Sequence, residues 1–260
     1  QTSDIRNNIM YTDSEGIILR QIKTANSRRM ILLFSRKYGK ISAGSSVSEK
    51  GRSKAALAMR PFTFGRYELF KNRDSYNINS GEVIKSFYKI GEDVDKYMCA
   101  SYVLEYTEKI LAEEQPMPKI FDLLIEFFGL LSERQKKYET LVSAYQIKTL
   151  ALLGNTPILD SCVICGRKDE LTAFSVKDGG AVCASCQNKM SAGSNVSLIF
   201  NAEFGTIGIL KYLLNNSLTS LEKIGLDEEA QTLVRNILKS YGEYHLDIAA
   251  LKSESFFMIK

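Results

Sequence analysis

The pattern of hydrophobic and polar residues changes character near Ile84. Before it, the stretch GIILRQIKTANSRRMILLFSRKYGKISA (16–43) alternates apolar or β-branched residues with polar ones, interrupted by the turn-like TANS and YGK. The stretch FTFGRYELFKNRDSYNINSGEV (62–83) continues this period of two after Pro61. Such alternation predicts short antiparallel strands. Several short strands without the spacing of βαβ units indicate a small barrel of the OB or SH3 kind.

After Ile84 the period becomes that of an amphipathic helix. Three helices are predicted before the cysteines, in EDVDKYMCASYVLEYTEKILAEEQ, in PKIFDLLIEFFGLLSE, which opens on Pro118, and in KKYETLVSAYQIKTLALLGNTP. Two more follow, in NAEFGTIGILKYLLNNSL and LDEEAQTLVRNILKSYGEYHLDIAALKS, the last with Asp227 as its expected N-cap. The predicted fold class is α+β, with a barrel at 1–80, a helical domain at 81–260 and a cysteine-rich insertion at 160–190.

Four of the five cysteines form two CxxC pairs, Cys162 with Cys165 and Cys183 with Cys186, separated by seventeen residues. Each pair can chelate from one tight turn, so this spacing predicts a four-thiolate zinc site. Gly166 follows the first pair, where such a turn favours a residue that tolerates positive φ. Two disulfides are the competing interpretation. The first residues lack the pattern of a secretion signal, and a reducing compartment disfavours disulfides.

The predicted zinc is structural rather than catalytic, because four thiolates leave no coordination position open for water. The fifth cysteine, Cys99, lies within a predicted helix and is expected to pack in the core. The single histidine, His245, is expected on a helix face rather than as a ligand or base. Because no second histidine could activate a nucleophile and no Walker A or GxGxxG motif is present, we expect no enzymatic activity.

The positive charge gathers at the start of the chain. Residues 1–80 contain fifteen Lys/Arg and six Asp/Glu, a net charge of +9, and residues 81–260 contain nineteen Lys/Arg and twenty-four Asp/Glu, a net charge of −5. This asymmetry predicts that the barrel binds a polyanion such as nucleic acid. The rings of Phe34, Tyr38, Phe62, Phe64 and Tyr67 could stack on bases if exposed, although core packing is favoured for each. The predicted DNA-binding residues are Arg20, Lys23, Arg28, Arg29, Arg36, Lys37, Lys40, Arg52, Lys54 and Arg66.

The order of these segments resembles the RecO family of bacterial DNA repair proteins. The similarity runs from about residue 14 to 257: GIILRQIKTANSRRMILLFSRKYGKISA, PFTFGRYELF, EVIKSFYKI, YVLEYTEKIL, the two CxxC pairs, and the terminal YHLDIAALKSESFF. The resemblance implies an OB-fold domain that binds single- and double-stranded DNA and anneals complementary strands. It also implies partnership with RecR in loading RecA, and contact with the acidic tail of single-stranded DNA-binding protein.

The sequence also bears on the location of the protein and on alternative functions. Apolar runs such as FDLLIEFFGLL are too short to span a bilayer, so we expect a cytoplasmic, nucleoid-associated protein with no membrane partner. Two alternatives stay open, a transcription or translation accessory protein whose zinc ribbon touches nucleic acid, and a zinc-dependent hydrolase. Residues 160–190 carry four basic and four acidic residues, which disfavours nucleic-acid binding by the ribbon. A count of three protein ligands plus water would favour the hydrolase.

Overall fold

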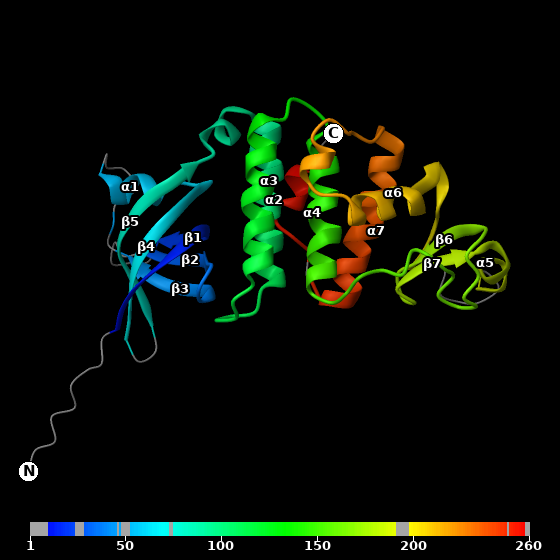
Figure 1. Cartoon of the computed structure of the whole chain (residues 1–260), viewed down its shortest axis with the longest axis horizontal. Helices are drawn as coiled ribbons and strands as arrows, with labels where there is room; N and C mark the ends of the chain where they lie inside the picture. Colours follow the sequence, from blue (N-terminus) through cyan, green and yellow to red (C-terminus); the bar gives the residue numbers. More distant parts are fainter. Residues whose placement is uncertain are drawn as a thin grey trace, which may run out of the picture. The chain divides into compact units, whose positions relative to one another are not determined.

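The computed structural model describes residues 10–23, 29–45, 47, 53–72, 75–190, 198–248 and 250–257. Figure 1 draws the whole chain, which divides into two compact units. The first unit runs to Ser132 and takes in the chain from Ser255, and the second spans Glu133–Glu254. The predicted boundary between residues 80 and 81 falls within a strand, Tyr76–Ser86, and the change from strands to helices follows Ser86. The compact units, however, divide only after the second long helix, because the barrel shares its packing with two helices.

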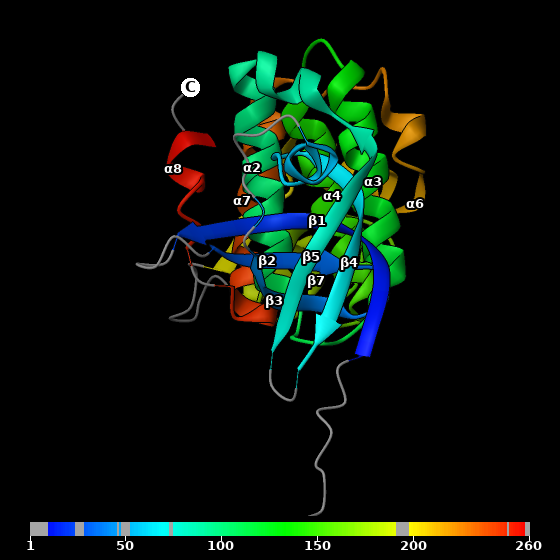
Figure 2. The same ribbon diagram turned by 90° about the vertical axis from the view of Figure 1, so that its left-hand side faces the viewer.

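Five strands form the mixed sheet of the first unit, coloured blue to cyan in Figure 2. They close into a barrel in the order β1-β2-β3-β5-β4. Neighbouring strands are antiparallel except β3 and β5, which run parallel over Ala43–Ser45. The bounds of the strands are β1 (Met10–Lys23), β2 (Arg29–Ser35), β3 (Gly39–Ser45), β4 (Thr63–Lys71) and β5 (Tyr76–Ser86).

The first strand begins earlier than the hydrophobic pattern indicates. The sequence places the start of the strand pattern near Gly16, whereas β1 starts at Met10. Residues Met10–Glu15 have few apolar side chains to reveal a strand, but they pair antiparallel with Arg66–Lys71 of β4. Backbone pairing with a neighbouring strand therefore determines this part of β1, where side-chain burial is weak.

Apolar side chains from alternate positions fill the barrel. The core includes Ile18, Ile31, Leu33, Ile41 and Leu69 together with the fully buried ring of Tyr67. A short helix, α1 (Lys54–Ala58), covers one end of this core, where its Ala58 carbonyl accepts a 2.8 Å hydrogen bond from the Tyr67 hydroxyl. The sequence alone shows no sign of α1, because a five-residue helix is too short to show a period.

Two long helices pack on the barrel within the first unit. After the short η1 (Tyr88–Glu92), Asp93 caps α2 (Val94–Ile110) by accepting from the Lys96 N–H, and α3 (Pro118–Glu133) opens on proline as predicted. The ring of Phe34 on β2 meets Phe121 of α3 edge to face, with centroids 5.2 Å apart. Burial of both rings joins the outer face of β2 to α3.

The segment between α2 and α3 covers an open edge of the barrel. Strand β3 pairs with β5 only over Ala43–Ser45, which leaves the β5-facing side of Gly39–Ser42 without a strand partner. Here the Glu114 N–H donates a 2.9 Å hydrogen bond to the Lys40 carbonyl. Gly39 has a φ of +71°, and a Cβ at this position would lie 2.1 Å from the Gln115 carbonyl oxygen. Only glycine allows the two backbones to approach so closely.

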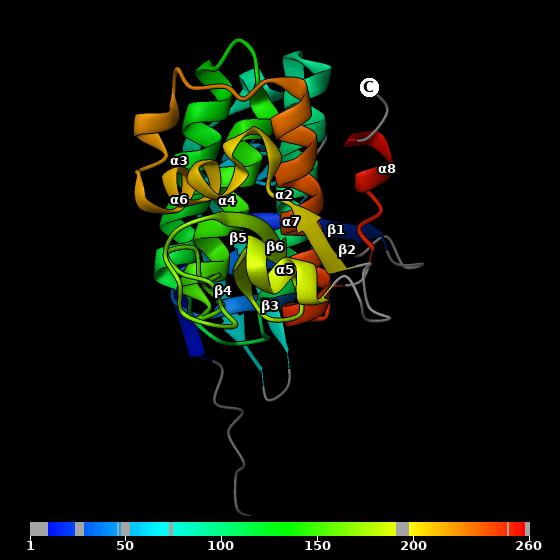
Figure 3. The ribbon, with the colours of Figure 1, turned by 90° about the vertical axis from the view of Figure 1, so that its right-hand side faces the viewer.

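The second unit combines helices with a small three-stranded sheet (Figure 3). The helices α4 (Tyr138–Leu152), α6 (Thr206–Asn215) and α7 (Glu228–Leu246) pack together, and Gln231 of α7 hydrogen-bonds with Thr140 and Ser143 of α4. Asp227 caps α7 as predicted. The remaining elements of this unit are β6 (Leu171–Ser175), β7 (Gly180–Cys183), α5 (Ala184–Met190), β8 (Ile199–Asn201), η3 (Glu203–Gly205) and η4 (Thr219–Leu221). The last helix, α8 (Glu254–Phe257), starts at the final residue of the second unit and otherwise belongs to the first.

Among the helices in the described ranges, none is both long enough and apolar enough to cross a membrane.

Candidate functional site

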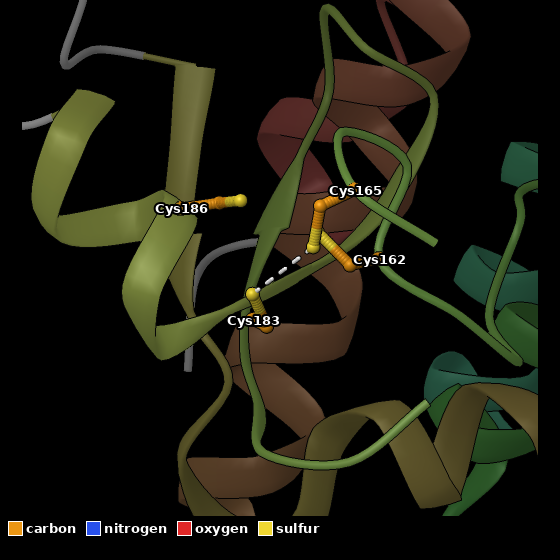
Figure 4. A group of neighbouring side chains, drawn as sticks. All are labelled: Cys162, Cys165, Cys183 and Cys186. Carbon is orange, nitrogen blue, oxygen red and sulfur yellow. Dashed lines mark hydrogen bonds between the residues drawn. The ribbon is translucent and has the colours of Figure 1, made fainter. Parts of the chain in front are cut away.

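The four cysteines of the two CxxC pairs converge on one point in the second unit. Figure 4 shows Cys162 and Cys165 on the turn before β6, Cys183 at the end of β7 and Cys186 on α5, with their sulfur atoms facing one another. The Gly166 N–H donates to the Cys162 carbonyl at 2.8 Å, which closes the first turn, and Gly166 has the positive φ that the sequence predicts there. The hairpin of β6 and β7 brings the second pair back to the first.

The spacing of the sulfur atoms suits a single metal ion. All four Sγ atoms lie within 4.8 Å of one another, and those of Cys165 and Cys183 are 3.7 Å apart. Two thiolates of a tetrahedral zinc site, each about 2.3 Å from the ion, are about 3.8 Å apart. The four cysteines are not joined by disulfides. The cluster can therefore hold a metal ion.

The thiols of the cluster differ in how readily they ionise. Burial raises the pKa of Cys162, but backbone N–H groups, among them those of Cys183 and Cys165, donate to its sulfur and lower the pKa to about 6. The pKa of Cys186 is raised to about 12, first by hydrogen bonding with Cys165 and then by burial. One thiolate forms easily, whereas further negative charge in so small a space requires a cation. The donor set therefore fits a divalent metal.

The single histidine, His245, and the fifth cysteine, Cys99, lie outside this cluster. His245 on α7 donates from Nε2 to the Val176 carbonyl at 2.7 Å, and its ring stacks on Tyr241 with centroids 4.2 Å apart. These contacts anchor the cysteine module, residues 160–190, to α7. His245 thus lies on a helix face, as the sequence predicts. Cys99 is buried on α2, which confirms its predicted place in the core.

Three of the predicted DNA-binding residues contact acidic groups on or near the helices of the first unit. Arg20 lies 2.9 Å from Glu108, and Arg36 lies 2.6 Å from Asp122. Lys40 lies 4.0 Å from the Glu113 carboxylate and also donates to the backbone carbonyl of Glu108 at 3.0 Å, and only 13% of its side chain is exposed. These cations help to join the barrel to the helices, which makes them less available to a phosphate backbone.

Four more of the predicted residues stand at other places on the barrel. Lys54 on α1 is 83% exposed and lies 3.5 Å from Glu82, and Arg66 on β4 lies 3.9 Å from Glu15. Lys37 donates to the Thr12 hydroxyl at 3.1 Å, and Arg29 begins β2. Arg28 and Arg52 lie outside the described residues, as does the side chain of Lys23. The structure therefore does not bring all ten predicted residues onto one surface.

One end of the barrel gathers cations that the sequence pattern did not group. The Gln21 side chain donates to the Met59 carbonyl at 2.8 Å and accepts from Arg29 at 3.4 Å, so Arg29 lies near the end of α1 and the exposed Arg60. Within the described ranges Arg60 forms no ion pair. We call Gln21, Arg29, Lys54 and Arg60 the α1 end of the barrel. This grouping depends on α1, for which the sequence pattern predicted no regular element.

The outer face of β1 and β4 has a different charge. Asp13 lies opposite Glu68 in the strand register, and Glu15 lies opposite Arg66. Acidic side chains thus occupy much of this face, which makes it a poor surface for phosphates. The α1 end is the better candidate for nucleic acid.

Most of the rings considered for base stacking are inside the protein. Phe34, Phe62 and Tyr67 are buried, which confirms that core packing is their role, and Phe64 packs edge to face on Phe121. A ring outside the predicted set, Tyr11, is 72% exposed beside Phe70. The hydrophobic pattern did not predict a strand at Tyr11, because the start of β1 is largely polar.

Comparison with known proteins gives consistent matches along the chain. Residues 10–87 match the family model described as "Recombination protein O N terminal", and residues 91–255 match "Recombination protein O C terminal". A protein named DNA repair protein RecO from Thermoanaerobacter sp. (strain X514) is 30% identical, over 94% of this chain and 95% of the relative. The protein of that name from Pelotomaculum thermopropionicum is 31% identical, over 94% of this chain and 92% of the relative.

Proposed function

Because the chain belongs to the RecO family of DNA repair proteins, we propose that it is a recombination mediator. It binds single- and double-stranded DNA, anneals complementary strands and, together with RecR, helps to load RecA onto DNA coated by single-stranded DNA-binding protein. The acidic tail of the coating protein is a further partner. Because its substrate is chromosomal DNA, the proposed place of action is the cytoplasm, at the nucleoid.

The first unit is proposed to be an OB-fold. That fold is a five-stranded barrel that binds oligonucleotides with its second and third strands and with the loops that follow β1 and β4. The observed closure in the order β1-β2-β3-β5-β4 supports this assignment. Arg29 stands at the β2 end of the first of these loops.

The observation that carries the proposal is the gathering of cations at the α1 end of a closed barrel. The Arg29 and Arg60 side chains would contact phosphates and release counterions, which makes binding sensitive to salt. Annealing requires no covalent chemistry, since a cationic surface reduces the repulsion between two phosphate backbones that are held close. We therefore propose that the protein is not an enzyme.

The cysteine cluster is proposed to hold zinc in a structural role. Four thiolate ligands would complete a tetrahedral shell and leave no position for a water nucleophile. The metal, when bound, would neutralise the thiolates and fix the β6–β7 hairpin to α5. This ligand set favours a structural role over the hydrolase alternative, and the balanced charge of residues 160–190 argues against the nucleic-acid-binding ribbon.

A strand-annealing assay on DNA coated by single-stranded DNA-binding protein tests the proposal. We expect wild-type protein to accelerate annealing, and the double variant Arg29→Ala/Arg60→Ala to bind DNA more weakly, with the salt slope reduced by about one for each phosphate that is no longer neutralised. Lys109→Ala, which removes an exposed cation from α2, is the matched control and should anneal normally. Wild-type protein that neither binds nor anneals DNA would overturn the proposed function.

A further inference from the structure

A groove in the second unit is lined by none of the four cysteines. It encloses about 810 Å³ between the segment that follows β8 and the first turns of α7. Helices α6 and α7, which flank this region, are visible in Figure 3. The groove is lined by Asn201, Glu203, Phe204, Asp227, Glu228, Glu229, Thr232, Leu233 and Asn236.

The charge of the groove is entirely negative. Four of its lining residues are acidic and none is basic. Among the residues that the structure describes, no ion pair engages these four carboxylates. Capping explains only part of this charge: Asp227 accepts from the Ala230 N–H, and Glu228 and Glu229 are favourable in the first turn of a helix. Glu203 belongs to a separate segment, η3, so two elements bring their carboxylates to the same groove.

The groove also exposes an apolar surface. Phe204 is 50% exposed, and Leu233 on α7 is half-buried beside the same space. An aromatic ring of this size usually packs inward, since its burial contributes about 1.5–3 kcal/mol. An exposed ring within a groove instead offers an anchor for an apolar side chain of a partner.

Hydrogen bonds hold the wall of the groove between β8 and α6 without any ligand. Gln187 on α5 donates to the Asn201 side chain at 2.7 Å and accepts from the Thr172 hydroxyl at 2.8 Å, which holds the end of β8. The Thr206 hydroxyl donates to the Glu203 carbonyl at the start of α6. A preformed groove needs little reorganisation on binding, which favours affinity.

We propose that this groove binds a positively charged peptide segment of a partner protein. An apolar side chain of the segment packs on Phe204 and Leu233, and flanking lysines or arginines face the carboxylates of Glu203 and the first turn of α7. Charge complementarity identifies the occupant: an acidic peptide or a nucleic acid strand would be repelled by the same four carboxylates. The groove belongs to the second unit and the α1 end of the barrel to the first, so the inference does not depend on DNA binding.

Fluorescence anisotropy with a labelled peptide, Lys-Lys-Phe-Lys-Lys, tests the proposal on the full-length protein. We expect saturable binding that weakens as salt rises, because the rim contacts are electrostatic. Replacing the phenylalanine of the peptide with serine should weaken binding about tenfold or more, since the apolar anchor is removed. A peptide with glutamates in place of the lysines should not bind. Absence of binding by the first peptide, or equal binding of all three, would overturn the proposal.

Two variants locate the binding in the groove. Glu228→Lys should weaken peptide binding at least about tenfold, because it places a cation on the rim. The matched control is Glu139→Lys, which reverses a first-turn carboxylate of α4 outside the groove and should bind like wild type. Phe204→Ala removes the apolar anchor at a position where the side chain is 50% exposed. If Glu228→Lys and Phe204→Ala bind as tightly as the control, the groove is not the site. DNA annealing should be unchanged in all three variants, so its loss would concern the proposed function instead.

Discussion

The barrel and the cysteine module show two different ways of holding a small sheet together. The barrel buries a continuous apolar core that includes Ile31, Leu33 and Leu69. The buried cluster around the cysteines contains five residues, and three of these are the candidate ligands Cys162, Cys183 and Cys186. Small sheets with so little apolar volume are rarely stable alone. The comparison therefore predicts that apolar burial stabilises the barrel, whereas the module depends on the metal ion that its cysteines are proposed to hold.

Removal of the metal should have the largest effect, and the effect should be confined to the module. We expect Cys183→Ser to abolish stoichiometric metal binding and to expose residues 160–190 to limited proteolysis, because metal-binding free energy is folding free energy in such modules. Measured metal content and the proteolysis pattern check this. Cys99→Ala, which changes a buried cysteine outside the cluster, should keep the metal. A metal-free Cys183→Ser protein with a protease-resistant module would contradict the comparison.

A cavity in the barrel should have the next largest effect, and it should spare the metal. Leu33 is fully buried, so Leu33→Ala should lower the free energy of unfolding by about 2–5 kcal/mol. Chemical denaturation with a probe in the first unit measures this decrease. Metal content should stay at the wild-type value, and a parallel loss of metal would mean that the two regions do not depend on separate sources of stability.

Lowering the pH should have a smaller effect, and it should release metal from the module while the barrel stays folded. The folded-state pKa of Cys162 is lowered from 9.0 to about 6. The stability that its thiolate contributes is complete above pH 9.0, declines below it and is lost as pH falls through about 6. Protons also compete with the metal for the thiolates. Colorimetric detection of released metal between about pH 8 and about pH 5 should show increasing release while the barrel stays folded. Release that is independent of pH would count against thiolate ligands.

The ion pairs between the barrel and its helices should matter least. Arg36 contacts Asp122 and Glu15 with its side chain 36% exposed, so Arg36→Ala should cost about 0–1 kcal/mol. Because its guanidinium is already engaged, DNA affinity should change little, in contrast to the Arg29→Ala/Arg60→Ala variant. Thermal unfolding and a DNA titration measure the two quantities. A drop in DNA affinity as large as that of the double variant would place Arg36 in the interface.

Local patterns predicted the regular elements well where a long stretch repeated one period. The alternation over 16–43 predicted β-strands there, and Pro118 and Asp227 marked the starts of α3 and α7. The polar start of β1 and the five-residue α1 were not predicted. The start of β1 has few apolar side chains, and α1 is too short to show a helical period. The division after Ser132 rests on contacts such as Phe34 with Phe121, which join residues distant in the sequence.

The cysteine cluster and the DNA-binding residues also differed in how far local sequence could predict them. The cysteine cluster could be predicted from spacing alone, since two tight turns and one hairpin bring its ligands together. The ten basic residues could not be ranked, because ion pairing of Arg20, Arg36 and Lys40 depends on acids in the distant segment 108–122. The link between Arg29 and Arg60 through Gln21 likewise depends on where α1 lies.

The backbone contact between Lys40 and Glu114 bears on how the barrel can be produced by itself. A strand edge with unpaired N–H and C=O groups is a template for aggregation, and in this protein the segment Glu113–Gln115 occupies that edge beside β3. A fragment that stops near residue 87, where the N-terminal family match ends, would leave the edge of Gly39–Ser42 open to other chains. Light scattering should therefore detect self-association of that fragment. A fragment that continues to Ser132 keeps Glu113–Gln115 over the strand edge and should stay monomeric by the same measurement.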